Sequence, residues 1–111
     1  MANFYKSDTF DLTTTNLTTV LTINASSIAI VRSVQVCVID NTNVDIDLFL
    51  KKSGGSDIEI AHKLLNKTTE NIAIPVINME AGDILKIQAD NANKASGQVS
   101  YLMIDRSQEN G

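Results

Sequence analysis

The chain has 111 residues, a formal net charge of −4 and a single cysteine. A chain of this length suits one domain around one hydrophobic core, so we expect no second domain in it. Nine Lys and Arg residues against thirteen Asp and Glu leave no basic patch for phosphates, so nucleic acid is not expected as a partner. The first residues lack an apolar signal segment and no apolar stretch approaches about 18 residues, so we expect a soluble product made in the cytoplasm, without a membrane span.

Residue composition favours strands over helices. The chain holds 13 Ile, 8 Val and 10 Thr residues, whereas Glu and Arg are scarce, and β-branched side chains fit a pleated sheet better than a helix. Turn signals recur about every eight to twelve residues, and the crossover helices of a parallel sheet are missing. The sequence therefore predicts an all-β, single-domain antiparallel β-sandwich, jelly-roll-like, with seven or eight strands.

The N-terminal residues 1–16 are polar and show no hydrophobic period, which predicts an arm preceding the domain. Such a segment would lose too much conformational entropy to fold alone, but it could add a strand along a neighbouring subunit. We expect its apolar side chains to contact that partner: Phe4, Tyr5, Phe10 and Leu12. The β-sandwich is then expected over residues 17–106, with a polar tail over 107–111.

The first two predicted strands of the domain differ in length. Thr18–Ile23 is short, whereas Ile28–Asp40 is the longest strand of the chain. Alternation assigns one face of this long strand to the core: Ile28, Ile30, Val34, Val36 and Val38. At about 3.3 Å per residue the strand would extend about 40 Å, so we expect it to bend or to serve two sheets.

The following segments alternate as strands as well. Val44–Lys52 has the cleanest alternation. Asp57–Leu65 shows period two in Ile58, Ile60, His62 and Leu64, although a helix capped by Ser56 or Asp57 is the rival prediction. The remaining elements are an edge strand over Asn71–Ile77 that contains Pro75, a turn over Asn78–Asp83 with Gly82 at positive φ, and strands over Ile84–Ala89 and Gln98–Ile104.

The sequence offers little for catalysis or metal binding. His62 is the only histidine and Cys37 the only cysteine, so no zinc spacing exists and no catalytic, cofactor or metal residues are predicted. His62 lies on an otherwise apolar strand face, which indicates a hydrogen-bonded core or interface residue, with a pH-sensitive interface as its functional interpretation. The valine-rich neighbours of Cys37 indicate a buried, inert thiol rather than a dyad with His62.

One exposed strand face carries alternating oxygen ligands at Asn41, Asn43, Asp45 and Asp47. Such a ladder could hold Ca²⁺, but the spacing fails as an EF-hand loop because Ile46 stands where glycine is required and Lys52 where a glutamate is. Outward charges that prevent aggregation of the strand explain the pattern better.

The last strand is apolar on both faces, with Val99, Tyr101 and Met103 opposite Leu102 and Ile104. A strand of this kind indicates that something besides the opposing sheet covers the second face. We expect a homo-oligomer to cover it.

Several segments resemble a family of small virion structural proteins of tailed bacteriophages. They are TTVLTI, IVRSVQVCVIDNTN, VDIDLFLKKS, IAHKLL, NMEAGDILKIQAD and QVSYLMI, between Thr18 and Asp105. The most specific are Glu80-Ala81-Gly82-Asp83 before ILKIQA, and Ser100-Tyr101-Leu102. The chain departs from the family pattern near Asn24-Ala25, where a proline is usual.

This resemblance implies a non-enzymatic β-sandwich without cofactor, made in the host cytoplasm and incorporated into the virion. It implies a capsid decoration or cement protein that bridges capsomers, with the major capsid protein or other virion proteins as partners. For the homo-oligomer expected from the apolar last strand, a trimer at a capsid threefold position is the expected assembly. A neck, tail or fibre-attachment subunit is the first alternative. A carbohydrate- or receptor-binding module, using loops near Ser53–Ser56 or Asn91–Ser96, is the second.

Overall fold

The computed structural model describes residues 2–39, 42–66, 69–71 and 76–106. The regular structure in these residues is entirely β, which confirms the predicted class, and none of them forms a helix that could cross a membrane. The strands are β1 (Ala2–Leu12), β2 (Thr18–Thr22), β3 (Ser27–Val38), β4 (Asn43–Lys51), β5 (Asp57–Asn66), β6 (Thr69–Asn71), β7 (Ile77–Met79), β8 (Ile84–Ala89) and β9 (Ala95–Asp105).

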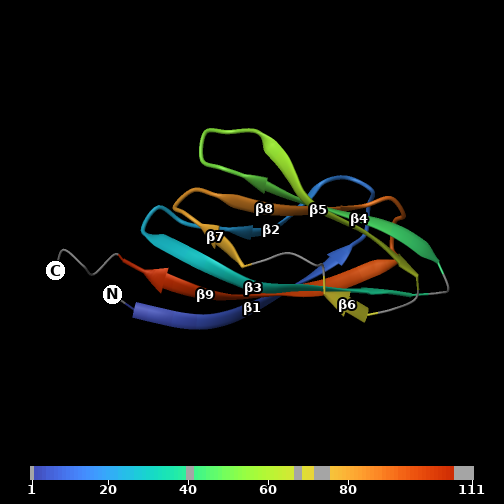
Figure 1. The fold of residues 1–111 in the computed structure, drawn as a ribbon, viewed down its shortest axis with the longest axis horizontal. Coiled ribbons are helices and arrows are strands. Elements are labelled where there is room, and N and C mark those ends of the chain that lie inside the picture. The colour runs from blue at the N-terminus through green and yellow to red at the C-terminus, as the bar shows by residue number, and fades with distance from the viewer. Residues whose placement is uncertain (1, 40–41, 67–68, 72–75, 107–111) are drawn as a thin grey trace.

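The strands form two antiparallel sheets that lie one above the other (Figure 1). The five-stranded sheet has the order β1-β9-β3, with β6 and β7 both on the far side of β3, and the four-stranded sheet has the order β2-β8-β4-β5. Pairing is nested around the β4–β5 hairpin: β3 pairs with β6 and β7, β2 with β8, and β1 with β9. This nesting is the topology of a jelly roll, as predicted. The molecule is elongated, at 53 × 26 × 23 Å.

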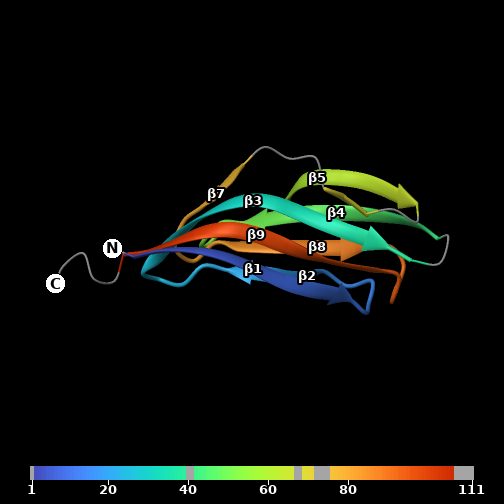
Figure 2. The same ribbon diagram turned by 90° about the horizontal axis from the view of Figure 1, so that it is seen from below.

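A strand replaces most of the predicted arm. Residues of β1 pair one by one with β9, from Ala2 opposite Asp105 to Leu12 opposite Ala95, and Figure 2 shows the two strands side by side along most of the molecule. Side chains from Asn3 to Thr9 are exposed on both faces of β1. A strand at a sheet edge that is held by its backbone ladder needs no hydrophobic period, which is why the sequence pattern did not reveal it.

The core face of β3 differs from the predicted one before residue 32, because the strand contains a β-bulge. The register of β3 against β9 shifts between Val31 and Ser33, so the extra residue, Arg32, reverses the alternation of side chains. Ala29 and Val31 are buried before the bulge, in place of the predicted Ile28 and Ile30, whereas the predicted residues from Val34 to Val38 are buried after it. The strand stays within one sheet rather than serving two.

The strand prediction for Asp57–Leu65 is correct and its helical alternative is wrong, because β5 pairs with β4 along its whole length. The predicted strand Asn71–Ile77 is represented by β6, which ends at Asn71, and β7, which begins at Ile77. Pro75 lies outside the described residues, as do Asn41 and the predicted tail at 107–111. The turn before β8 has Gly82 at a φ of 84°, as expected.

The core lies between the two sheets and is almost wholly aliphatic. Its centre consists of side chains with no exposed surface: Val34, Val36, Val44, Ile46, Leu48, Leu85, Ile87 and Val99. They come from the middle strands of both sheets. Burial of this kind stabilises a fold by about 1.5–3 kcal/mol for each large aliphatic side chain.

Candidate interaction surface

The outer face of the five-stranded sheet carries a group of four aliphatic side chains. Register pairs place Ile28 beside Ile104 and Ile30 beside Leu102. The alternate residues of both strands, such as Ala29 and Tyr101, are buried on the inner side, so these four side chains point outward. We call Ile28, Ile30, Leu102 and Ile104 the aliphatic quartet, and each member keeps an intermediate exposure.

Beyond the quartet the same face continues as a band of small or amide side chains. The register pairs of β3 with β9 are Ser33 with Ser100, Gln35 with Gln98, and Cys37 with Ser96. The Gln98 Nε2 atom donates a hydrogen bond to Gln35 Oε1 at 3.0 Å. The band is thus uncharged, and Cys37 belongs to it with intermediate exposure, which corrects the prediction of a buried thiol.

Charged side chains are rare on this face. Arg32 projects from the bulge, and its guanidinium lies 5.7 Å from the centre of the Tyr5 ring, within the range of a cation–π interaction. Asp11, which pairs with Ser96 in register, is the other charge that the described parts of β1, β3 and β9 place there. Exposed apolar surface with so few charges is typical of a protein contact.

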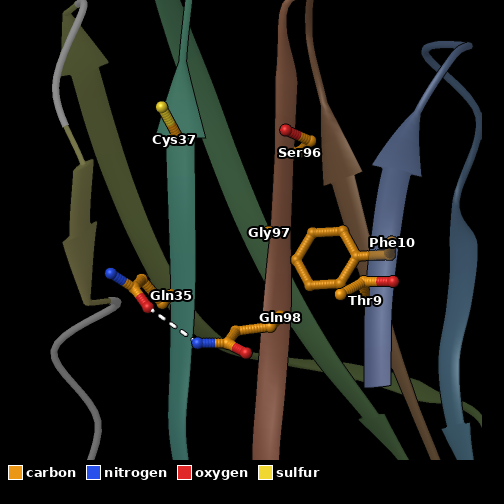
Figure 3. Close-up of a pocket in the computed structure, with 7 residues that line it drawn as sticks. All are labelled: Thr9, Phe10, Gln35, Cys37, Ser96, Gly97 and Gln98. Atoms are coloured by element: carbon orange, nitrogen blue, oxygen red, sulfur yellow. Dashed lines mark hydrogen bonds between the residues drawn. The ribbon is translucent and has the colours of Figure 1, made fainter. Parts of the chain in front are cut away.

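A shallow pocket of about 380 Å³ indents the uncharged band (Figure 3). Its lining residues come from β1, β3 and β9: Thr9, Phe10, Gln35, Cys37, Ser96, Gly97 and Gln98. Gly97 creates the depression, because a Cβ atom there would collide with the Gln35 carbonyl oxygen and would lie 2.8 Å from the Phe10 ring. The pocket offers hydroxyl and amide groups without a charged or strongly basic side chain, so nothing in its lining activates a nucleophile.

The outer face of the four-stranded sheet has the opposite character. Its outward side chains on β4, β5 and β8 include a series of charges: Asp45, Asp47, Lys51, Asp57, Glu59, His62 and Lys86. The Lys86 Nζ atom lies 3.0 Å from Asp57 Oδ1. Such a face is well solvated and suits contact with water.

His62 lies on this charged face rather than in an apolar environment. Its Nδ1 atom is hydrogen-bonded to Asp47 Oδ1, and its Nε2 atom lies 3.5 Å from Asp45 Oδ1. The side chain is 55% exposed, because His62 pairs in register with the outward Asp47. A bulge between Leu48 and Phe49 in the pairing of β4 with β5 separates it from Ile58, which the sequence placed on the same face. The hydrogen bond to Asp47 and the nearby carboxylates raise the pKa of His62 above its ordinary value.

The two titratable residues considered as a dyad lie on different faces of the sandwich. Cys37 is on the outer face of the five-stranded sheet, whereas His62 is on the outer face of the four-stranded sheet. Among the described residues no group of three metal-ligating side chains gathers in a way that could hold a metal ion. The interpretation of Asn43, Asp45 and Asp47 as a charged strand face agrees with their outward positions on β4.

The structure divides the four predicted arm residues. Leu12 is 1% exposed and belongs to the core of this chain, and Phe10 is partly buried against that core. Phe4 and Tyr5 are 43% and 75% exposed, on opposite faces of β1. A role in partner binding therefore stays a prediction, and it now concerns Phe4 and Tyr5 above all.

A buried tyrosine fastens β1 to β9. The Tyr101 hydroxyl donates a hydrogen bond to Asp8 Oδ2 at 2.8 Å, and the tyrosine is only 5% exposed. Burial, together with the Asp8 carboxylate, raises the pKa of Tyr101 to about 12. The interaction gives the otherwise exposed β1 a specific side-chain anchor near the middle of its length.

The Glu80–Asp83 segment, the most specific part of the family resemblance, forms a structural corner. Asp83 is 1% exposed, and its carboxylate accepts hydrogen bonds from the backbone NH of Glu80 at 2.8 Å and of Ser53 at 3.1 Å, and from Lys52 Nζ at 2.5 Å. Burial alone would raise the pKa of Asp83, but these donors outweigh it and hold the pKa below its ordinary value. The corner ties the β4–β5 turn to the start of β8.

Sequence reasoning missed this role of Asp83, although an Asp directly after a turn glycine and before an apolar strand was a usable signal. Gly82 fits the same corner closely, because a Cβ atom would lie 2.8 Å from Ser53 Oγ. Its backbone NH also donates to the Ile23 carbonyl oxygen at 2.9 Å. The predicted glycan-binding loop at Ser53–Ser56 is thus held partly by the corner.

No known family model and no curated protein matches the sequence. Solved structures that share the fold include those of a phage capsid chain, a TNF and a pilus protein. A chain of the acidic stable capsid structure of Helicobacter pylori bacteriophage KHP30 superimposes with a TM-score of 0.60 at 12% identity, over 96% of this chain and 90% of that one. The Eiger TNF of S. frugiperda gives 0.55 at 9% identity, over 94% and 95%.

The third structure belongs to the Bacillus endospore appendages, which form a family of disulfide-linked pili. It gives a TM-score of 0.51 at 11% identity, over 91% of this chain and 85% of that one. At such identities the likeness concerns the fold alone. The chain is therefore a β-sandwich of a kind also found in a phage capsid structure, a TNF and a pilus.

Proposed function

We propose that the protein is a non-enzymatic structural subunit of a phage virion, which decorates the capsid and stabilises the head by bridging capsomers. One observation carries the proposal: an extended, nearly uncharged outer face with an aliphatic quartet, on a sandwich whose Lys52–Asp83 and His62–Asp47 pairs lie in the corner and on the solvated face. Such a surface binds protein better than it performs chemistry. The fold shared with a chain of a phage capsid structure supports the same proposal.

The mechanism that we propose is mechanical. A subunit that buries apolar area against two neighbouring capsomers adds contacts that must break before the capsomers separate. Head particles with the subunit should therefore need more heat to release their DNA. The interpretation of the protein as a neck, tail or fibre-attachment subunit uses the same surface, and it differs in where the subunit is found.

The test is to locate the protein in gradient-purified virions of the phage that encodes it. We expect mass spectrometry to find the chain at a fixed ratio to the capsid subunit, and immunogold labelling to mark the head. Virions from which the gene has been deleted should release DNA at a lower temperature, and supplying the protein in trans should restore the original value. Labelling confined to the neck or tail would support the alternative, and absence from virions would refute both.

The structure changes how the predicted arm should be tested. Deletion of residues 1–15 would remove the whole of β1 together with the core residue Leu12, so it would not leave the domain intact. Replacement of the exposed Phe4 and Tyr5 by serine leaves the backbone ladder with β9 in place. We expect this double variant to fold and to bind particles more weakly than the native chain.

A further inference from the structure

We infer that a second copy of this chain packs on the outer face of the five-stranded sheet, with the aliphatic quartet at the centre of the contact. The inference deepens the proposed function and rests on it for the biological role of the assembly.

The charge distribution favours a second copy as the occupant. The chain has a net charge of −4, so two copies repel each other unless they meet through surfaces with few charges. The outer face of the five-stranded sheet is such a surface, since the long strands place only Arg32 and Asp11 on it. Asp11 lies far from the quartet in register, and the Arg32 guanidinium lies over the ring of Tyr5, which pairs with Leu102. The charged face of the other sheet, with Asp45 and Asp47 among its carboxylates, is unsuited to contact with itself.

Partly exposed apolar side chains lie side by side on this face, whereas the exposed aliphatic residues of the other sheet, Ile58, Ile60 and Leu64, lie on its edge strand β5. The quartet occupies the two middle strands, β9 and β3, and exposed apolar residues flank it on both sides. Tyr5 of β1 pairs in register with Leu102 and is 75% exposed, and Val76, directly before β7, is 59% exposed. Apolar residues at the centre with hydroxyl and amide groups around them are the usual composition of a stable protein interface.

The face is large enough for such a contact. Three strands paired over eleven positions extend about 37 Å in one direction and about 14 Å in the other, at about 3.4 Å per residue and about 4.8 Å per strand. The projected area is roughly 500 Å², and β7 and the relief of the side chains add to it. A standard interface buries about 800 Å² on each partner, so this face can supply most of what a stable contact needs.

The contact also explains why the quartet is aliphatic. Two of its members, Ile28 and Ile30, lie near the start of β3, and their side chains point outward because the bulge at Arg32 reverses the alternation. They are isoleucines at positions where a solvated sheet would carry polar residues. Against a second copy, quartet on quartet is an apolar pairing that needs no hydrogen-bond partner.

The experiment measures the solution mass of the full chain by light scattering over a hundredfold dilution. We expect an oligomer of the native chain, and a fall to the monomer mass of 12.0 kDa for Leu102→Lys, which places a charge at the centre of the quartet. The matched control is Leu64→Lys, a leucine in β5 that is 57% exposed and points outward on the charged face. This control should keep the native mass.

Both leucines lie outside the core, and circular dichroism on each variant checks that it folds. If Leu102→Lys does not fold, Leu102→Ser serves as the milder variant and should shift the dissociation midpoint to at least tenfold higher concentration. A monomeric native chain at all concentrations would refute the inference, as would a native mass for both Leu102 variants or an equal loss for Leu64→Lys. An oligomer that is absent from virions would contradict the proposed function and leave this inference standing. A monomer that is found on virions would refute this inference and leave the proposed function standing.

Discussion

Replacement of Asp83 by alanine should destabilise the domain far more than its place in a surface turn suggests. The substitution removes a carboxylate that is 1% exposed and leaves the backbone NH groups of Glu80 and Ser53 without their acceptor. A hydrogen bond to a charged group contributes about 1.5–3 kcal/mol. Allowing for water that reaches the two freed NH groups, we expect the free energy of unfolding to fall by about 3 kcal/mol.

The assay is urea unfolding followed by circular dichroism, at one protein concentration because self-association would shift the midpoint. A loss of this size corresponds to a lowering of Tm by about 12 °C for a domain of this length. Glu80→Ala is the matched control: it removes the exposed partner of the same lysine, whose Nζ lies 2.8 Å away. An exposed ion pair contributes about 0–1 kcal/mol, so this control should stay close to the native value.

The pH dependence gives a second readout for Asp83. Its pKa is lowered in the folded chain, so its stabilising contribution is complete above the ordinary pKa of 3.8 and is lost as the pH falls through the folded value. The native chain should therefore lose stability in acid more steeply than Asp83→Asn does. A free energy of unfolding of Asp83→Ala within about 0.5 kcal/mol of the native value would refute this role of Asp83, as would an equal loss of stability in Glu80→Ala.

Three further predictions concern other parts of the fold. Gly97→Ala should cost about 1–3 kcal/mol in urea unfolding because its Cβ atom has no room in the sheet, and an unchanged midpoint would contradict this. Tyr101→Phe removes the hydroxyl that donates to Asp8 and should lower the free energy of unfolding by about 1 kcal/mol. Because the pKa of Tyr101 in the folded chain is about 12, the native chain should lose stability as the pH rises from about 10 to about 12. The variant should not show this loss. NMR titration should place the pKa of His62 above 6.5, and Asp47→Asn should lower this pKa. The His62–Asp47 pair then stabilises the fold below pH 6.5, and this stabilisation is lost as the pH rises through the folded pKa. A histidine with an unshifted pKa would rule out the pairing.

A strand with one buried face and one exposed face can be predicted directly from its sequence. Val44–Lys52 alternates along its length, and the structure pairs it with a strand on each side as β4. The turn at Gly82 was predictable for a different reason, because a positive φ favours glycine. Local chemistry and period two are both visible in a single sequence, so these features needed no knowledge of the partner strands.

The features that were missed depend on what lies opposite. β1 is held by backbone pairing with a strand nearly a hundred residues away, and its side chains show no period. The bulge at Arg32 reverses the burial of every residue before it in β3, and a one-residue insertion leaves no mark on composition. The outward Leu102 and Ile104 were predicted to need a cover, whereas Ile28 and Ile30 were assigned to the core, so half of the aliphatic quartet could be found.

The nested pairing of the strands has a consequence for how the chain matures on the ribosome. The innermost pair, β4 with β5, closes over a short turn, but β1 cannot pair until β9 has been synthesised. At about 5–20 residues per second, β1 waits about 5–20 s with its backbone unpaired. Lys6, Asp8 and Asp11 along it are charges of the kind that discourage unpaired strands from joining one another. The polar character of β1 therefore protects the nascent chain during the interval before its partner strand exists.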